Sequence, residues 1–154
     1  MYAIIYKTNE GKAAEILEHL MTCDKDFVPP LSHRIDLTAY SVKLVKYATN
    51  FEAWNVQKEL VGLVSVYMND LDVKTAFITN VSVCPEFTGK GIAKRLMAAC
   101  LKEAKQKGFL QLQLEVNKLN APAIKLYSAF GFDITEIKKK IIKMNLKLKS
   151  NDNE

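Results

Sequence analysis

Residues 81–96 of this chain read Val81-Ser82-Val83-Cys84-Pro85-Glu86-Phe87-Thr88-Gly89-Lys90-Gly91-Ile92-Ala93-Lys94-Arg95-Leu96. An apolar strand ends here, two glycines follow one residue apart, and an amphipathic helix starts directly after them. Glycine allows left-handed backbone angles and close approach of a ligand to the main chain, and the first turn of a helix offers free N–H groups with partial positive charge. The stretch therefore predicts a phosphate or pyrophosphate site. The alternative is a strand-to-helix turn whose glycines serve geometry alone.

The glycine spacing narrows the kind of phosphate site. A dinucleotide-binding loop needs three glycines as G-x-G-x-x-G, and a Walker loop ends in G-K-[ST]; residues 89–94 fit neither pattern. Residues 88–93 do resemble the acyl-CoA signature R/Q-x-x-G-x-G/A of the GCN5-related N-acetyltransferase (GNAT) family. Gly91 and Ala93 match this signature, whereas Thr88 stands where the family has Arg or Gln.

A second segment, residues 120–132, supports the same resemblance. It is similar to the family pattern N-x-x-A-x-x-L-Y-x-x-x-G-F, and the matching residues are Asn120, Ala123, Leu126, Tyr127, Gly131 and Phe132. The two motifs occur in the family's order with a strand between them. The resemblance covers roughly residues 51 to 132, and the first 50 residues match only in general layout.

The pattern of the chain predicts a single α/β (α+β) domain. Apolar periodicity and turn residues indicate helices near residues 11–21, 36–48, 91–107 and 120–131, and strands near 51–56, 60–68, 76–83, 110–116, 132–137 and 141–148. The resemblance implies a mixed, mostly antiparallel sheet that splays at the CoA site, with helices on both faces. We expect one acyl-CoA N-acyltransferase domain over residues 1–149 and a polar tail over 150–154.

Composition bounds the class of protein. The 154 residues are 49% hydrophobic and 25% charged, as in a globular domain. No apolar run approaches the roughly 20 residues of a membrane span, and residues 1–7 lack the pattern of a signal peptide. The three cysteines show neither metal-binding spacing nor a disulfide framework, so we expect no metal and a reducing, cytoplasmic location.

The net charge of +5 suits an anionic cofactor better than nucleic acid. Six lysines crowd residues 138–149, where they alternate with apolar residues as on the solvated face of a strand. Aromatic residues, which would stack on bases, are not interleaved with them. We therefore expect neither a nucleic-acid nor a membrane partner.

The resemblance implies how acetyl-CoA, as co-substrate, is bound. Backbone N–H groups of the loop and first helical turn would hold the pyrophosphate, namely those of Gly89, Gly91, Ile92, Ala93 and Lys94. The main chain of Val81 and Val83 would pair with the pantetheine arm, and Asn120 would also bond it. For Asn120 a helix N-cap is an equally good interpretation.

The resemblance also implies catalytic roles. Tyr127 would lie at the cofactor sulfur and protonate the leaving thiolate as a general acid; the alternative is that it only packs. Glu115, near the end of a strand, is the candidate general base by layout. Asp70 and Asp72 are alternatives, and Thr79, Asn80 and Asn117 are candidates to hold a water instead.

The acceptor is expected to be a primary amine of a small molecule, such as an amino sugar or amino acid. The loop over residues 27–34 carries Ser32, His33 and Arg34, of which Arg34 suits a carboxylate or phosphate. With Asn117, Ser32 and Arg34 form the predicted acceptor-binding set. A non-catalytic acyl-CoA sensor and a protein N-acetyltransferase are the alternatives, and a homodimer is expected only from family habit.

Overall fold

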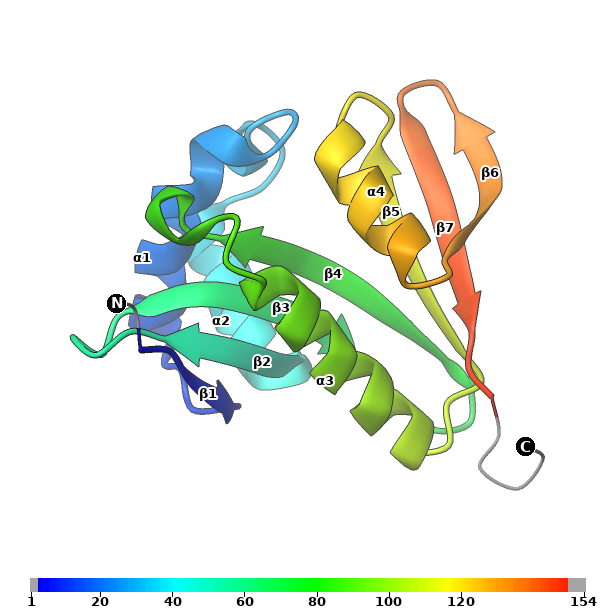
Figure 1. Ribbon diagram of the computed structural model, residues 1–154, viewed down its shortest axis with the longest axis horizontal. Helices are drawn as coiled ribbons and strands as arrows, with labels where there is room; N and C mark the ends of the chain where they lie inside the picture. The colour runs from blue at the N-terminus through cyan, green and yellow to red at the C-terminus, as the bar shows by residue number, and fades with distance from the viewer. Residues whose placement is uncertain (1–2, 150–154) are drawn as a thin grey trace.

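The computed structural model describes residues 3–149, and the predicted polar tail over 150–154 lies outside these described residues. A seven-stranded sheet has the order β1-β2-β3-β4-β5-β7-β6 (Figure 1). Its strands are β1 (Ile5–Thr8), β2 (Thr49–Trp54), β3 (Leu60–Tyr67), β4 (Thr75–Val83), β5 (Gln111–Asn117), β6 (Asp133–Lys138) and β7 (Ile141–Lys147). Neighbouring strands are antiparallel except β4 and β5. The predicted mixed, mostly antiparallel sheet is confirmed.

The helices lie close to where the sequence predicts them. They are α1 (Ala13–Cys23), α2 (Leu37–Tyr47), α3 (Ile92–Gln106) and α4 (Ala121–Ala129), with short 3-10 turns η1 (Asp24–Asp26), η2 (Leu31–His33) and η3 (Pro85–Phe87). Asp36 caps α2, because its carboxylate accepts from the N–H groups of Thr38 and Ala39. Gly108, at φ +90°, follows the C-terminus of α3. None of the helices within residues 3–149 is both long and apolar enough to cross a bilayer.

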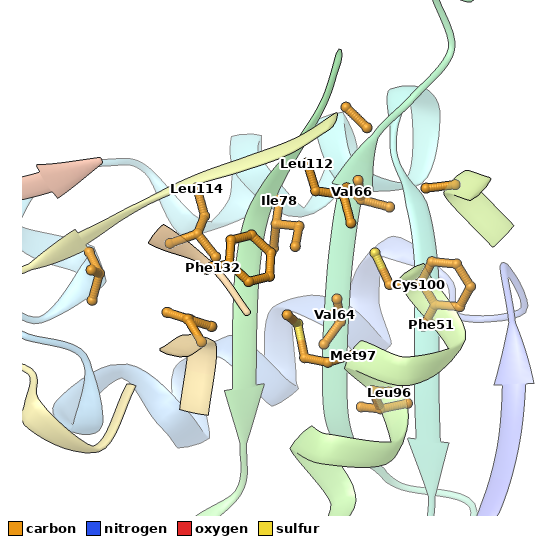
Figure 2. Close-up of a cluster of buried hydrophobic side chains, with 14 of the residues drawn as sticks. Phe51, Val64, Val66, Ile78, Leu96, Met97, Cys100, Leu112, Leu114 and Phe132 are labelled. Atoms are coloured by element: carbon orange, nitrogen blue, oxygen red, sulfur yellow. The ribbon is translucent and has the colours of Figure 1, made fainter. Parts of the chain in front are cut away.

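Two hydrophobic cores lie on opposite faces of the sheet. The smaller core joins α1 and α2 to the sheet and consists of Ile16, Leu20, Leu31, Leu44, Trp54, Leu60 and Leu63. The larger core contains the apolar stripe of α3, and Figure 2 shows its Leu96, Met97 and Cys100 against side chains of the sheet. Burial of each such aliphatic side chain contributes about 1.5–3 kcal/mol. This arrangement confirms helices on both faces.

The sequence analysis missed β1, which forms one edge of the sheet. Among the described residues β1 pairs only with β2, and Ile5 in it is 49% exposed, so no buried alternation marks the strand. The buried carboxylate of Glu52 in β2 holds the segment that follows β1. It accepts from the N–H groups of Glu10 and Gly11 and from the indole N–H of Trp54. The chain therefore enters α1 at a position set by β2.

The sheet splays between its two parallel strands. The ladder of β4 with β5 joins only residues 75–77 to residues 111–113, and beyond it the strands diverge (Figure 1). On its other side, β4 stays paired with β3 as far as Val83, with a bulge that leaves Thr79 without a partner in the register. The edge of β4 that faces β5 is therefore open from Ile78 onward.

Candidate active site

A cleft of about 400 Å³ lies at the open end of β4. Its walls come from β4, from the glycine loop with the start of α3, from the start of α4, and from the segment at the end of α1 and in η1. It is lined by all the predicted cofactor residues except Tyr127, namely Val81, Val83, Gly89, Gly91, Ile92, Ala93, Lys94 and Asn120. The fold thus brings together two motifs that are about thirty positions apart in the sequence.

The glycine loop has the geometry that an anion cradle needs. Gly89 and Gly91 have φ angles of +76° and +79°, and a Cβ at either would meet no atom within 4 Å. Gly91 is the N-cap of α3, and the first helical bond runs from the Arg95 N–H to the Gly91 carbonyl at 3.0 Å. The N–H groups of the first turn therefore lack helical acceptors. The residues of this turn, Ile92, Ala93 and Lys94, line the cleft.

Thr88 occupies the position where the family has Arg or Gln. Its hydroxyl donates to the carbonyl of Pro85 at 2.9 Å, within the turn η3. Thr88 still lines the cleft. Its side chain thus stabilises the turn, and the backbone of the loop is left as the main anion-binding element.

A second, smaller hollow of about 170 Å³ adjoins the cleft across the splay. Among the residues that line it are Arg34, Thr79, Asn80, Glu115, Asn117 and Tyr127. Five further residues line both hollows, namely Phe27, Val81, Asn120, Ala123 and Leu126. The two hollows therefore meet at the open edge of β4, with the predicted cofactor residues in one and most of the predicted reactive residues in the other.

Tyr127 is the buried hydroxyl in this second hollow. Its side chain is 7% exposed, and its ring centroid lies 6.0 Å from that of Phe132. Burial raises the pKa of Tyr127 to about 12, so the phenol keeps its proton at neutral pH. Within residues 3–149 no hydrogen bond to this hydroxyl is found, which leaves it able to donate to a ligand.

The polar residues of the hollow differ in how far they are already engaged. Glu115 and Arg34 are exposed to solvent. The Asn117 side-chain oxygen accepts from the N–H of Leu119 at 2.9 Å. Asn120 caps α4, because its side-chain oxygen accepts from the N–H of Ala123 at 3.2 Å. The N-cap interpretation of Asn120 is confirmed, and its amide NH₂ remains as the group for a cofactor.

Ser32 does not line either hollow. Its hydroxyl donates to the Asp24 carboxylate at 2.6 Å, and its N–H donates to the same group at 2.8 Å. These two bonds lower the pKa of Asp24. Ser32 thus joins η2 to η1, and it does not lie with Arg34 and Asn117, the other residues predicted to bind the acceptor. Asp70 and Asp72 belong to the turn before β4, where the N–H of Asp72 donates to Asp70.

Sequence analysis missed two features of the site. Cys23, Asp26 and Phe27 form one wall of the cleft, although no site residue is predicted at the end of α1 or in the turn after it. Tyr40 lies in the helix that apolar periodicity predicts over residues 36–48. Its hydroxyl donates to the Thr79 carbonyl at 3.0 Å and lies 2.7 Å from the Thr79 hydroxyl. Tyr40 therefore supports the bulge of β4, and the helical period around it carries no sign of this bond.

Such a splayed sheet, with a glycine-loop cleft at its open strand, is the architecture of an acyl-CoA-binding fold. A family model described as the acetyltransferase (GNAT) family matches residues 14–132. The chain belongs to this family.

Similar proteins agree with this assignment. Over 69 residues, 45% of this chain and 46% of the relative, it is 39% identical to a ribosomal protein bS18 alanine N-acetyltransferase of Haemophilus ducreyi. The chain thus aligns with about half the length of this curated relative. The corresponding enzyme of Escherichia coli superposes over 100% of this chain and 99% of its own, with a TM-score of 0.76 at 19% identity. PaiA N-acetyltransferase of Thermoplasma acidophilum, solved with coenzyme A, superposes over 94% and 99% with a TM-score of 0.70 at 18% identity.

Proposed function

We propose that this protein is an N-acetyltransferase that moves an acetyl group from acetyl-CoA directly to the primary amine of a small molecule. The observation that carries the proposal is the meeting of two hollows at the open edge of β4, with the protonated phenol of Tyr127 beside their junction. Direct transfer requires both substrates to be bound at once, and a hollow on each side of one strand edge suits that requirement. The proposal assigns residues 1–149 to one acyltransferase domain.

The residues of the cleft fit acetyl-CoA. Gly89 and Gly91 line the cleft, and no protein atom lies within 4 Å of where a Cβ would stand at either position, so the main chain of the loop is open to a pyrophosphate. The Asn120 amide and the open main chain of Val81 and Val83 are polar groups at which a pantetheine arm can bond. When bound, acetyl-CoA supplies an activated acyl group as a thioester.

The residues of the smaller hollow supply the two proton transfers. The amine nitrogen forms a bond to the thioester carbonyl carbon, and the carbon–sulfur bond breaks. Tyr127 donates its proton to the leaving sulfur, which a phenol kept protonated by burial can do. The attacking amine loses a proton to Glu115, directly or through a water held by Thr79, Asn80 or Asn117.

The charges of the hollow suggest an amino acid as acceptor. Arg34 and Glu115 line the same space of about 170 Å³ and carry opposite charges. An α-amino acid presents a carboxylate, which the guanidinium binds in a fork geometry, and an ammonium, which the Glu115 carboxylate attracts. An amino sugar would use Glu115 alone.

The N-terminus of a protein is the second candidate acceptor. It is favoured by the relative from Haemophilus ducreyi, which is named as acting on an alanine of ribosomal protein bS18. The N-terminal residue of a protein has an amine but no free α-carboxylate. This acceptor would therefore make no use of the charge on Arg34.

Thiol release from acetyl-CoA, measured with three sets of acceptors, tests the proposal. The sets are free amino acids, their methyl esters together with amino sugars, and short peptides with free N-termini. We expect turnover with free amino acids, and we expect Arg34→Gln to raise KM for them but not for their methyl esters. Turnover with peptides alone would favour the protein acceptor. Binding of acetyl-CoA without turnover on any amine would support a sensor and overturn the proposal.

A further inference from the structure

Two thiols and an imidazole meet in the interior, between the C-terminal half of α1 and the end of β4. The Sγ atoms of Cys23 and Cys84 are 3.9 Å apart, and Nδ1 of His19 lies 3.4 Å from the Cys84 Sγ. All three side chains are buried, and both cysteines are free thiols. The proposed acetyl transfer uses none of them.

The hydrogen bonds of His19 decide which way its protons point. Nδ1 lies 3.0 Å from the carbonyl oxygen of Leu60, which can only accept, so Nδ1 carries a hydrogen. The same nitrogen faces the sulfur of Cys84. On the other side of the ring, Nε2 lies 2.8 Å from the Ser82 hydroxyl, which in turn accepts from the Asn80 amide. The single Nδ1 hydrogen is thus held between the Leu60 carbonyl at 3.0 Å and the Cys84 sulfur at 3.4 Å.

Cys84 receives donors from two sides. The S–H of Cys23 donates to its sulfur, and the Nδ1–H of His19, which it shares with the Leu60 carbonyl, is the second donor. The S–H of Cys84 itself donates to the Leu60 carbonyl at 3.7 Å. The hydrogen bond from Cys23 and then that from His19 lower the pKa of Cys84, against the opposing effect of burial. The same hydrogen bond and burial raise the pKa of Cys23. The donors that face the Cys84 sulfur therefore stabilise its thiolate, and Cys23 supplies one of them.

The two cysteines line different hollows. Cys84 lines a hollow of about 370 Å³, and Cys23 lines the cofactor cleft. The charged residues around the first hollow are Glu15, Glu18, Glu59, Glu86 and Lys58. This acidic rim repels anionic reagents such as glutathione disulfide and admits a small neutral oxidant.

We propose that Cys84 is a peroxide-reactive thiol and Cys23 its resolving partner, and that the resulting disulfide weakens binding of acetyl-CoA. The Cys84 sulfur attacks one oxygen of a hydroperoxide, the O–O bond breaks, and the other oxygen leaves as water or alcohol while Cys84 becomes a sulfenic acid. The Cys23 sulfur then attacks that sulfur. An S–S bond forms, the S–O bond breaks, and the oxygen leaves as water with the Cys23 proton. Two thiols are oxidised and one peroxide is reduced.

The route to the cofactor follows from how the two cysteines are held. A disulfide needs its sulfurs about 2.05 Å apart. The backbone of Cys84 is fixed, because its N–H donates to Val61 and its carbonyl accepts from Phe87, both at 2.8 Å. Cys23 itself lines the cofactor cleft together with Asp26 and Phe27, so closing the sulfur–sulfur separation from 3.9 Å moves a side chain of the cleft wall. Oxidation would displace that wall.

The test treats the whole protein with hydrogen peroxide and follows its intact mass, mapped disulfides and acetyl-CoA affinity. Cys100 provides the matched control, since it is fully buried and burial raises its pKa to about 12. We expect the parent protein and Cys100→Ser each to lose the mass of two hydrogens. Cys23→Ser should stop at a sulfenic acid that dimedone traps at Cys84, and Cys84→Ser should not react. Ser82→Ala, which frees the His19 ring, should slow the first step.

Affinity is measured on the same samples by calorimetry. We expect oxidation to raise the Kd of acetyl-CoA at least about fivefold, a typical coupling between sites. A thiol reductant should restore the original Kd. Peroxide should not raise the Kd in Cys23→Ser or in Cys84→Ser. Peroxide that leaves Cys84 unmodified, or a sulfenic acid that Cys23 never resolves, would overturn the proposal. The proposal would also be overturned if the purified protein carried one equivalent of zinc that is absent from Cys84→Ser. A disulfide that leaves the Kd unchanged would overturn it as well.

Discussion

Gly91 and Gly108 form a matched pair at the two ends of α3. Gly91 has a φ of +79° and Gly108 a φ of +90°, and a Cβ at either position meets no atom within 4 Å. Substitution by alanine therefore introduces no clash in the protein and adds only the cost of a left-handed backbone. That cost is about 1–2 kcal/mol for an L-residue. We expect Gly91→Ala and Gly108→Ala to lower the free energy of unfolding by similar amounts.

The two variants should differ in cofactor binding. Gly91 lines the cleft, whereas Gly108 does not line it. Either the methyl group at Gly91 occupies space over the loop, or the loop leaves its left-handed angle and turns its N–H groups away from the pyrophosphate. The alanine variant must return to the left-handed angle to bind the cofactor, which lowers its binding free energy by about 1–2 kcal/mol. This loss corresponds to a rise in Kd of about 5- to 30-fold.

Calorimetric titration with acetyl-CoA and denaturant unfolding of both variants provide the measurements. The expected result is a weaker Kd for Gly91→Ala alone, with comparable losses of stability for the pair. An unchanged Kd for Gly91→Ala would refute the cradle assignment. Equal weakening in Gly108→Ala would show that the effect comes from the stability of α3 and not from the loop.

Tyr127→Phe is expected to lower kcat about a hundredfold, as loss of a general acid does, with the Kd of acetyl-CoA unchanged; an undiminished kcat would leave Tyr127 with a packing role only. Glu115→Gln should lower turnover at neutral pH and regain activity as pH rises, because the amine then loses its proton to solvent; a pH–rate profile like that of the parent would exclude Glu115 as base. Glu52→Gln should cost about 1.5–3 kcal/mol of unfolding free energy, since the buried carboxylate accepts three N–H groups; a neutral result in urea would contradict this. Burial raises the pKa of Tyr127 and Tyr40 from 10.0 to about 12, so these phenols ionise at lower pH in the unfolded chain than in the folded protein. The free energy of unfolding should therefore fall as the pH rises from about 10 to 12. The fall should be less steep in Tyr127→Phe.

Local features were predictable from sequence because each depends on residues a few positions apart. The cap at Asp36, the glycine after α3 and the apolar stripe of α3 all follow from helical period and end chemistry. The residues that the family motifs predict to bind the cofactor likewise line one cleft, with the exception of Tyr127. The edge strand β1 escaped prediction, because a short strand exposed on most of its length has no buried alternation.

Pairings across the fold were not predictable in the same way. The sequence shows three distant cysteines, yet tertiary packing brings Cys23 and Cys84 within 3.9 Å and places His19 beside them. It also shows Ser32 in a polar loop, and only the folded chain turns that hydroxyl toward Asp24. No local pattern encodes either contact, because each joins segments that the chain separates.

The sequence by itself therefore determined the family, the helices and the glycine loop, since hydrophobic period, caps and backbone-permissive residues act over one or two turns of chain. Only the tertiary structure decided where β4 leaves β5, that the two hollows meet at that edge, and which buried polar groups face one another. These features depend on strand register and on packing between elements dozens of residues apart. The stabilising free energy arises from contact between the two elements, and neither segment has it alone.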